Sequence, residues 1–190
     1  YLGVNYTGTA EAWIEDGARV KAGAGGITVR ADNHDLLVAV AQSGGTAEKV
    51  GITGSFLNYD ARHDTRAWIE DRAVVDSGGA IDVIAHADML AVEVTGAVEQ
   101  GGKVAAGASI ALTDLTNTTE AFIGNRTTSS VTTAGSVIAA GKVNLAADVD
   151  EQTITVAIAG AFVGGTAGSQ GTAGGKTGGI GVSGAVAVNT

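Results

Sequence analysis

The chain has 190 residues, including 30 Gly but no Pro and no Cys, and hydrophobic residues make up 45% of it although only 4% are aromatic. This hydrophobic content argues against an intrinsically disordered chain, and a net charge of −9 argues against the basic footprint that nucleic-acid binding requires. A core of small and β-branched side chains favours thin, closely stacked strands, while the absence of Cys removes disulfides and thiolate metal sites.

An internal repeat organises the chain. The motif AWIED at residues 12–16 returns at residues 67–71 and, altered to AFIGN, at residues 121–125. We therefore expect a single β-solenoid segment over residues 1–190, with repeats at about 5–58, 59–112 and 113–190. Neither end shows a polar capping element, so the segment is expected to be a fragment of a longer array.

Within each repeat, apolar residues alternate with period 2, which is the period of a strand. In the first repeat the alternation runs through Val20, Ile27 and Val29 and resumes at Val38 after an expected corner at residues 32–35. Glycines at 23–26, 44–45, 78–79 and 101–102 are expected to form tight turns. The pattern predicts about five short strands per repeat, arranged as two rungs of a three-sided coil, with three shorter rungs as the competing arrangement.

Two segments of the third repeat depart from this pattern. Residues 127–133 are rich in Ser and Thr and are expected to form a lengthened turn, and residues 164–179 are expected to form a Gly-rich excursion. The apolar run at 153–168 is shorter than the roughly 20 residues that a bilayer helix needs. We therefore interpret this run as strand, turn and strand.

The repeats resemble those of a known class of bacterial proteins. Units such as residues 12–23 (AWIEDGARVKAG) followed by residues 27–31 (ITVRA) are similar to the β-helical repeats of filamentous-haemagglutinin-type exoproteins and leukotoxin-like giant surface proteins. The resemblance covers essentially the whole chain and implies an all-β, right-handed parallel β-helix at the bacterial cell surface or in the extracellular space. Expected partners are neighbouring repeats of the same long chain and a host or cell-surface glycan or protein receptor. Neither nucleic-acid binding nor membrane insertion of this segment is expected.

Two acidic pairs at residues 15–16 and 70–71 are candidates for general acid and base or for oxygen ligands of a hard cation. The third repeat has Gly124 and Asn125 at this place, so the property that all three copies share is turn formation. We expect acidic corners without a cofactor, with weak calcium binding left open.

All three histidines lie near acids, which suggests a zinc site or a catalytic dyad. The aligned repeats do not keep them, because His34 aligns with Asp88 and Asp150, and His86 aligns with Asp32. We interpret His34, His63 and His86 as solvated corner residues. The Ser at 109 belongs to an expected strand, and the segment GGKT at 174–177 lacks the preceding Gly of a phosphate-binding loop. No catalytic, cofactor or metal residue is therefore predicted, and no enzymatic activity is expected.

Trp13, Trp68 and Phe122 recur at one position per repeat and are the candidate surface contact. Two or three rungs between copies would separate the rings by roughly 10 to 15 Å, too far to stack directly. We expect them to pack at a corner, with a row that contacts carbohydrate as the alternative.

The leading hypothesis is a structural rod segment of a secreted or surface-displayed bacterial adhesin or filament. One alternative is a carbohydrate- or ice-binding face, which requires regular outward rows of Thr or aromatic residues. The aligned outward position of Thr28, Asp82 and Asn144 argues against a Thr row. A second alternative is a β-helical polysaccharide-degrading enzyme, which requires clustered carboxylates or basic residues in one groove.

Overall fold

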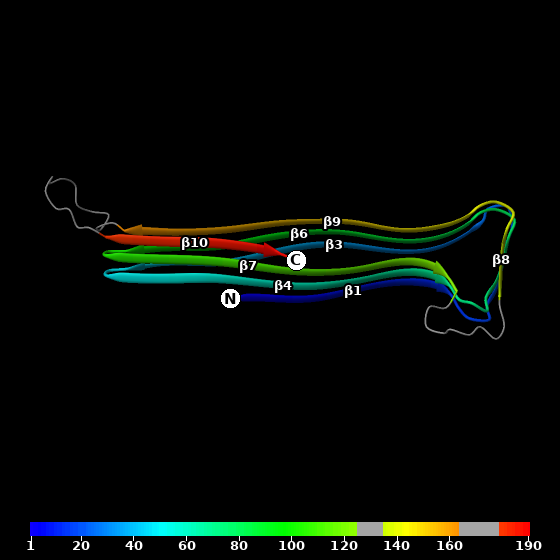
Figure 1. Cartoon of the computed structure of the whole chain (residues 1–190), viewed down its shortest axis with the longest axis horizontal. Helices are drawn as coiled ribbons and strands as arrows, with labels where there is room; N and C mark the ends of the chain where they lie inside the picture. Colours follow the sequence, from blue (N-terminus) through cyan, green and yellow to red (C-terminus); the bar gives the residue numbers. More distant parts are fainter. Residues whose placement is uncertain (125–134, 164–178) are drawn as a thin grey trace.

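The computed structural model describes residues 1–124, 135–163 and 179–190, and this part of the chain is all-β. Three parallel sheets have the strand orders β1-β4-β7-β10, β2-β5-β8 and β3-β6-β9. The chain passes through them in turn as a β-solenoid, which confirms the predicted parallel, all-β architecture (Figure 1). The strands are β1 (Leu2–Ile14), β2 (Arg19–Ala22), β3 (Ile27–Ala47), β4 (Val50–Ile69), β5 (Val74–Ser77), β6 (Ile81–Gly101), β7 (Val104–Ile123), β8 (Ser136–Ala139), β9 (Val143–Val163) and β10 (Ile180–Asn189).

Each repeat forms a single coil. Leu2 pairs with Leu57 and Val50 pairs with Val104, so each residue lies beside its counterpart in the next repeat. Ile27, Ile81 and Val143 share one column, as stacked repeats require. The predicted stacking is therefore confirmed, and the predicted division of each repeat into two or three rungs is wrong.

The rung prediction fails because polar residues do not end the strands of this chain. The expected corner at residues 32–35 lies in the middle of β3, and Gly44 and Gly45 lie further along the same strand. Polar side chains that point outward meet solvent, and Asp35, which points inward, is bound by Tyr6 and His63. A coil thus has two long strands and one short strand in place of about five short ones.

The actual turns lie where the chain enters and leaves the short sheet and at the opposite end of the coil. Gly17 and Gly26 adopt positive φ values of 74° and 82°. A Cβ at Gly26 would also lie 2.6 Å from the Ala80 carbonyl oxygen of the next coil, so this turn requires glycine on two grounds. The chain turns at 23–26 and bends at 78–79 and at Gly102, as predicted, but Gly101 is the last residue of β6, and of these glycines Gly26 alone has a positive φ.

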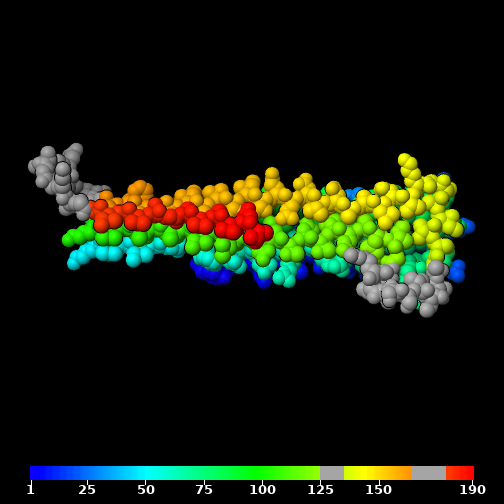
Figure 2. All heavy atoms as spheres, in the orientation of Figure 1, coloured from blue at the N-terminus to red at the C-terminus, as the bar shows by residue number. Residues whose placement is uncertain are grey.

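The molecule is long and narrow in the view of Figures 1 and 2, and the two long sheets differ along their length. We call the part built from residues 1–3, 36–58, 90–112, 152–163 and 180–188 the thin half, and the rest of the described chain the wide half. The short sheet β2-β5-β8 belongs to the wide half and holds the two long sheets apart there.

The wide half contains an apolar core. Its buried side chains come from all three sheets and include Ile69, Val75, Ile81 and Val83. A second cluster around Leu57, Tyr59 and Met89 spans the boundary and reaches into the thin half through Leu57 and the alanines at 39, 41, 91 and 111. Beyond that cluster the sheets approach so closely that a Cβ at Gly107 would lie 2.5 Å from the Gly160 carbonyl oxygen.

Candidate functional site

The three aromatic residues singled out by the repeat form a stacked column, the aromatic ladder (Trp13, Trp68 and Phe122). Trp13 and Trp68 have ring centroids 5.1 Å apart with planes 8° apart, and Trp68 and Phe122 have centroids 5.8 Å apart with planes 7° apart. The prediction that these rings are too distant to stack is wrong, because the copies are one coil apart.

Stacking decides what the ladder can do chemically. A sugar would bind through the face of an aromatic ring, and in the ladder Trp68 has both faces covered by its neighbours. Its indole N–H also donates a hydrogen bond of 2.7 Å to Glu70, which fixes the ring in its plane. The geometry therefore favours the packing interpretation over a carbohydrate platform.

Two histidines lie in rows of acids on the outer face of β3-β6-β9. His34 Nδ1 lies 3.5 Å from Asp88 Oδ2, and His86 Nδ1 lies 3.3 Å from Asp148 Oδ2. The alignment of these positions is as predicted, but they lie on strands and not at corners. Within residues 1–124, 135–163 and 179–190, no cluster of three His, Cys, Asp or Glu side chains is placed to hold a metal ion.

His63 corrects the expectation that all three histidines are solvated, because its side chain is only 3% exposed. His63 Nδ1 lies 2.8 Å from Asp35 Oδ2 and 3.2 Å from the Asn33 amide nitrogen. The Tyr6 hydroxyl donates to Asp35 Oδ1 at 2.7 Å, and this bond to the carboxylate raises the pKa of Tyr6. Together these side chains link the first two coils inside the wide half.

This internal cluster depends on the absence of a side chain at Gly8. A Cβ there would lie 3.2 to 3.3 Å from Asn33, Asp35 and His63. Gly8 pairs with His63, which in turn pairs with Asn117 of the third coil. A large side chain in one repeat opposite Gly in the preceding one is the sequence signal that could have revealed the cluster. Within the cluster the His63 side chain is buried, whereas the Asp35 side chain is 20% exposed.

The acidic pairs occupy turns, as predicted. The amide of Ala18 bonds to the Glu15 carbonyl at 3.0 Å, and the amide of Ala73 bonds to the Glu70 carbonyl at 3.2 Å. The Asp16 carboxylate also binds the Arg72 guanidinium of the next coil. A pocket of about 350 Å³ lies at this corner, and Glu70, one of the two acids that line it, already accepts the Trp68 bond. Asn125, the turn at 127–133 and the segment at 174–177 lie outside the described residues.

Part of the thin half reverses the usual placement of polar and apolar side chains, although Leu57 is fully buried there. Inside it, Glu93 is fully buried and accepts a 2.5 Å hydrogen bond from the Thr113 hydroxyl, and burial raises the pKa of this carboxyl. Burial and the nearby Glu93 raise the pKa of Tyr59 to about 12. Ser55, Thr95 and Ser109 form a closed hydrogen-bonded triad in the same interior.

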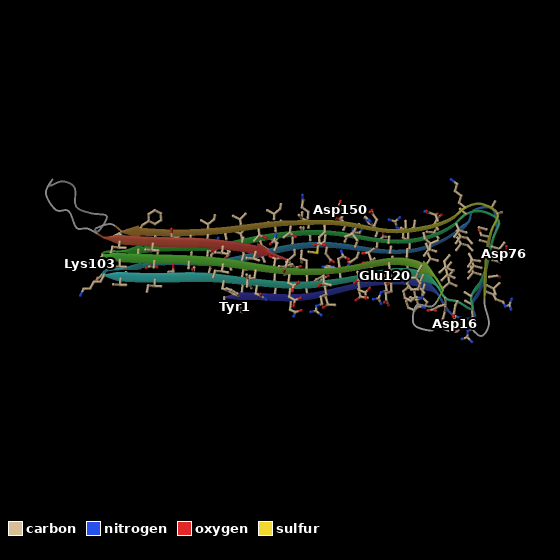
Figure 3. The ribbon with its side chains drawn as sticks, viewed as in Figure 1. Tyr1, Asp16, Asp76, Lys103, Glu120 and Asp150 are labelled. Carbon is tan, nitrogen blue, oxygen red and sulfur yellow. The ribbon has the colours of Figure 1, made fainter. Side chains whose placement is uncertain are left out.

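Both outer surfaces of the thin half carry many apolar side chains, and Figure 3 shows mostly carbon there, up to the tip marked by Lys103. The exposed side chains of Gln42, Gln100 and Gln152 lie on the same side of β3-β6-β9. The β6 face, on β3-β6-β9, consists of Leu36, Val38, Val40, Leu90, Val92, Val94, Val98, Ile154, Val156, Ile158 and Phe162. The β7 face, on β4-β7-β10, consists of Val50, Ile52, Phe56, Val104, Ile110, Leu112, Ile180, Val182, Val186 and Val188.

No protein-family model, curated protein or solved structure matches the chain. Among the residues that the structure describes, none lies in a helix long and apolar enough to cross a bilayer. Function therefore has to be inferred from the geometry of the coils and their surfaces.

Proposed function

We propose that the chain is a structural segment of a secreted or surface-displayed bacterial adhesin or filament and that it has no enzymatic activity. The observation that carries this proposal is the uninterrupted ladder through the central coil. All 21 residues of β6 pair in parallel with β3 on one side and with β9 on the other. A stack joined in this way distributes an axial load over many backbone hydrogen bonds at once.

The size of the coil determines the shape of such a structural segment. Each coil adds only about 4.8 Å along the axis, whereas a strand of 20 residues such as β4 extends about 65 Å across it. Stacked repeats of this length therefore extend much further along their strands than each adds along the solenoid axis. The structural role is accordingly that of a broad slab whose outer surfaces are large, and less that of a thin spacer rod.

Neither alternative function gains a supporting observation in the described part of the chain. Thr28, Asp82 and Asn144 share one outward column, so this position does not form the Thr row of an ice-binding face. The stacked aromatic ladder offers its ring edges along the column. Several outward acids of the wide half are paired with basic side chains, as in Arg66 with Asp64 at 2.6 Å.

Single-molecule force spectroscopy tests the structural role. With handles at Tyr1 and Thr190, we expect stepwise unfolding in which each coil, about 54 residues long, releases roughly 190 Å of chain. Gly26→Ala should lower the unfolding force, because its Cβ would meet the Ala80 carbonyl, whereas Gly23→Ala meets nothing within 4 Å and serves as the control. Smooth extension at low force would contradict the proposal. Antibody labelling of intact cells tests the surface location.

A further inference from the structure

Alternation of apolar side chains does not by itself fix which residues of neighbouring coils pair. The apolar core decides which side of a strand faces inward, but a displacement by two residues keeps every side chain on its own side. If β4 moved by two residues along β1, Ala12 would face Ile69 in place of Ala67. This contact remains apolar, so another feature has to select the observed pairing.

The internal cluster of the wide half does distinguish the two pairings. Gly8 pairs with His63. A Cβ at this glycine would lie 3.2 to 3.3 Å from Asn33 Nδ2, Asp35 Oδ2 and His63 Nδ1, so the polar groups meet over a position that has no side chain. The displaced pairing would set His63 over Tyr6, a large side chain, in place of the glycine. It would also shift the imidazole by about 6.6 Å relative to Asp35, more than twice the length of a hydrogen bond, so their contact would be lost.

The cluster is poorly suited to a purely stabilising role. His63 Nε2 is buried and has no hydrogen-bond partner in the part of the chain that the structure describes. Buried polar groups contribute little net stability, whereas each one that is left unpaired destabilises the arrangement that contains it. The cluster therefore has its greatest energetic effect on the pairings that it excludes.

The same columns do not repeat the cluster between the second and third coils. The Asn33 column continues with Ala87 and Val149, and the column of His63 continues with Asn117. Two of the polar positions of the first interface thus become aliphatic or lose the imidazole. The cluster therefore distinguishes the first pair of coils from the second.

We propose that the internal cluster is a pairing lock, which fixes the first two coils residue for residue and excludes the pairing displaced by two residues. The lock consists of Tyr6, Gly8, Asn33, Asp35 and His63. Such a device goes beyond the proposed structural role and does not depend on it, because the pairing of the coils is defined whatever surface the stack presents.

Disulfide trapping in the full chain tests the lock, because the chain contains no Cys. Thr7 and Arg62 pair beside the cluster and point outward, so Thr7→Cys with Arg62→Cys reports the observed pairing. Thr7→Cys with Asp64→Cys reports the displaced pairing. Its Cα atoms lie about 8 Å apart in the observed pairing, too far for a disulfide, and about 4.8 Å apart after the displacement. Both reporters also carry Trp13→Ala, because the stacking of Trp13 on Trp68 favours the observed pairing from the outer side.

With the cluster intact, mild oxidation should close the reporter of the observed pairing and leave the displaced reporter open. His63→Ala removes the ring that opposes the displacement and should raise closure of the displaced reporter at least about fivefold, the factor that one unpaired buried group produces. Val83→Ala is the matched control, because it weakens the apolar core without touching the cluster and should leave the displaced reporter open. Peptide mass spectrometry of the monomer measures the closed fraction.

Circular dichroism of each variant checks that the strands form. Asp35→Ala, which removes the shared partner of Tyr6 and His63, replaces His63→Ala if that variant loses its strand signal. Closure of the displaced reporter with the cluster intact overturns the proposal, as does equal closure with and without the His63 ring. A Val83→Ala chain that closes the displaced reporter as readily as His63→Ala would show that the cluster only stabilises the coils and does not select their pairing.

Discussion

The two halves of the molecule share one backbone ladder and differ in where their hydrophobic side chains lie. In the wide half, Ile69, Ile81 and Val83 are fully buried and the outer surface carries Arg, Asp and His. In the thin half, Ile52 is 77% exposed while Glu93 lies inside without exposure. Because both halves keep the same parallel register, the ladder is compatible with either arrangement of side chains.

Because of this difference, we expect the two halves to contribute differently to stability and to surface properties. The wide half holds each coil together, because an apolar core makes a cooperative unit independent of partners. The thin half extends the same strands and presents many of their hydrophobic side chains outward, and its buried apolar residues are mostly alanines near the boundary, together with Leu57. Substitutions that exploit this contrast should therefore have effects that depend strongly on the half in which they fall.

The largest contrast is expected for removal of an isoleucine. Ile81→Ala empties a fully buried position and should lower the free energy of unfolding by about 2–5 kcal/mol. Ile52→Ala removes the same atoms from an exposed position in the thin half and should cost no more than about 0.5 kcal/mol. Urea unfolding at a concentration where the chain is monomeric measures both. Equal losses would mean that the thin half is as well packed as the wide half.

The aromatic ladder should give the next largest effect. Trp68→Ala removes two stacked contacts together with the bond to Glu70, and we expect a loss of about 2–3 kcal/mol in unfolding free energy. Trp13→Ala removes only one of these stacked pairs and should cost about half as much. Thermal unfolding compares the two variants, and Trp68→Phe should recover most of the loss. Identical values for Trp13→Ala and Trp68→Ala would contradict a stacked column.

Sequence reasoning predicted the stack and its columns but not the size of a coil. The pairing of Ile27 with Ile81 and Val143 follows from aligning the repeats, since equal positions in stacked copies must lie over one another. The length of a strand does not follow from alternation alone. The polar residues at 32–35 continue the strand, and Tyr6 and His63, which are distant in sequence, contact Asp35, the one acid among them that points inward. Such long-range pairing leaves no local signal.

The same limit explains why the faces of the thin half were missed. Strict alternation shows that two sides of a strand differ, but it does not say which side is inside. Around Val92, Glu93 and Val94 the hydrophobic residues suggest an inward side, yet Glu93 is the one that is buried. The choice is set by the register of the whole strand, which the apolar core of the wide half fixes.

The internal cluster around His63 should have an intermediate effect. His63→Ala leaves Asp35 and Asn33 without their ring partner inside the wide half, which should cost about 1–3 kcal/mol. His34→Ala removes an exposed pair with Asp88 and should cost less than about 1 kcal/mol. Chemical denaturation measures both, and His63→Asn should be milder than alanine because Asn117 occupies the same column in the next coil. A loss at His34 as large as that at His63 would refute the distinction.

The smallest expected effect concerns the buried acid of the thin half and its dependence on pH. Burial raises the pKa of Glu93 above its ordinary value of 4.5, so the folded chain keeps this proton over a range in which the unfolded chain releases it. Folding stability from this group is therefore fully present below pH 4.5 and declines as the pH rises through the raised pKa. Glu93→Gln keeps the acceptor for Thr113 and carries no charge. It should raise the unfolding free energy by on the order of 1 kcal/mol at neutral pH and change it little in acid.

The matched variant for this measurement is Glu15→Gln, which makes the same substitution at an exposed carboxylate in the turn after β1. If Glu93→Gln raises the unfolding free energy more at higher pH, the ionised Glu93 carboxyl destabilises the thin half, and the rest of the coil compensates for this. If Glu93→Gln instead lowers the unfolding free energy equally at every pH, the carboxyl group of Glu93, through its bond to Thr113, holds the two sheets together. In that case the thin half would have a polar core of its own, and the contrast between the halves would lie in the kind of core and not in its presence.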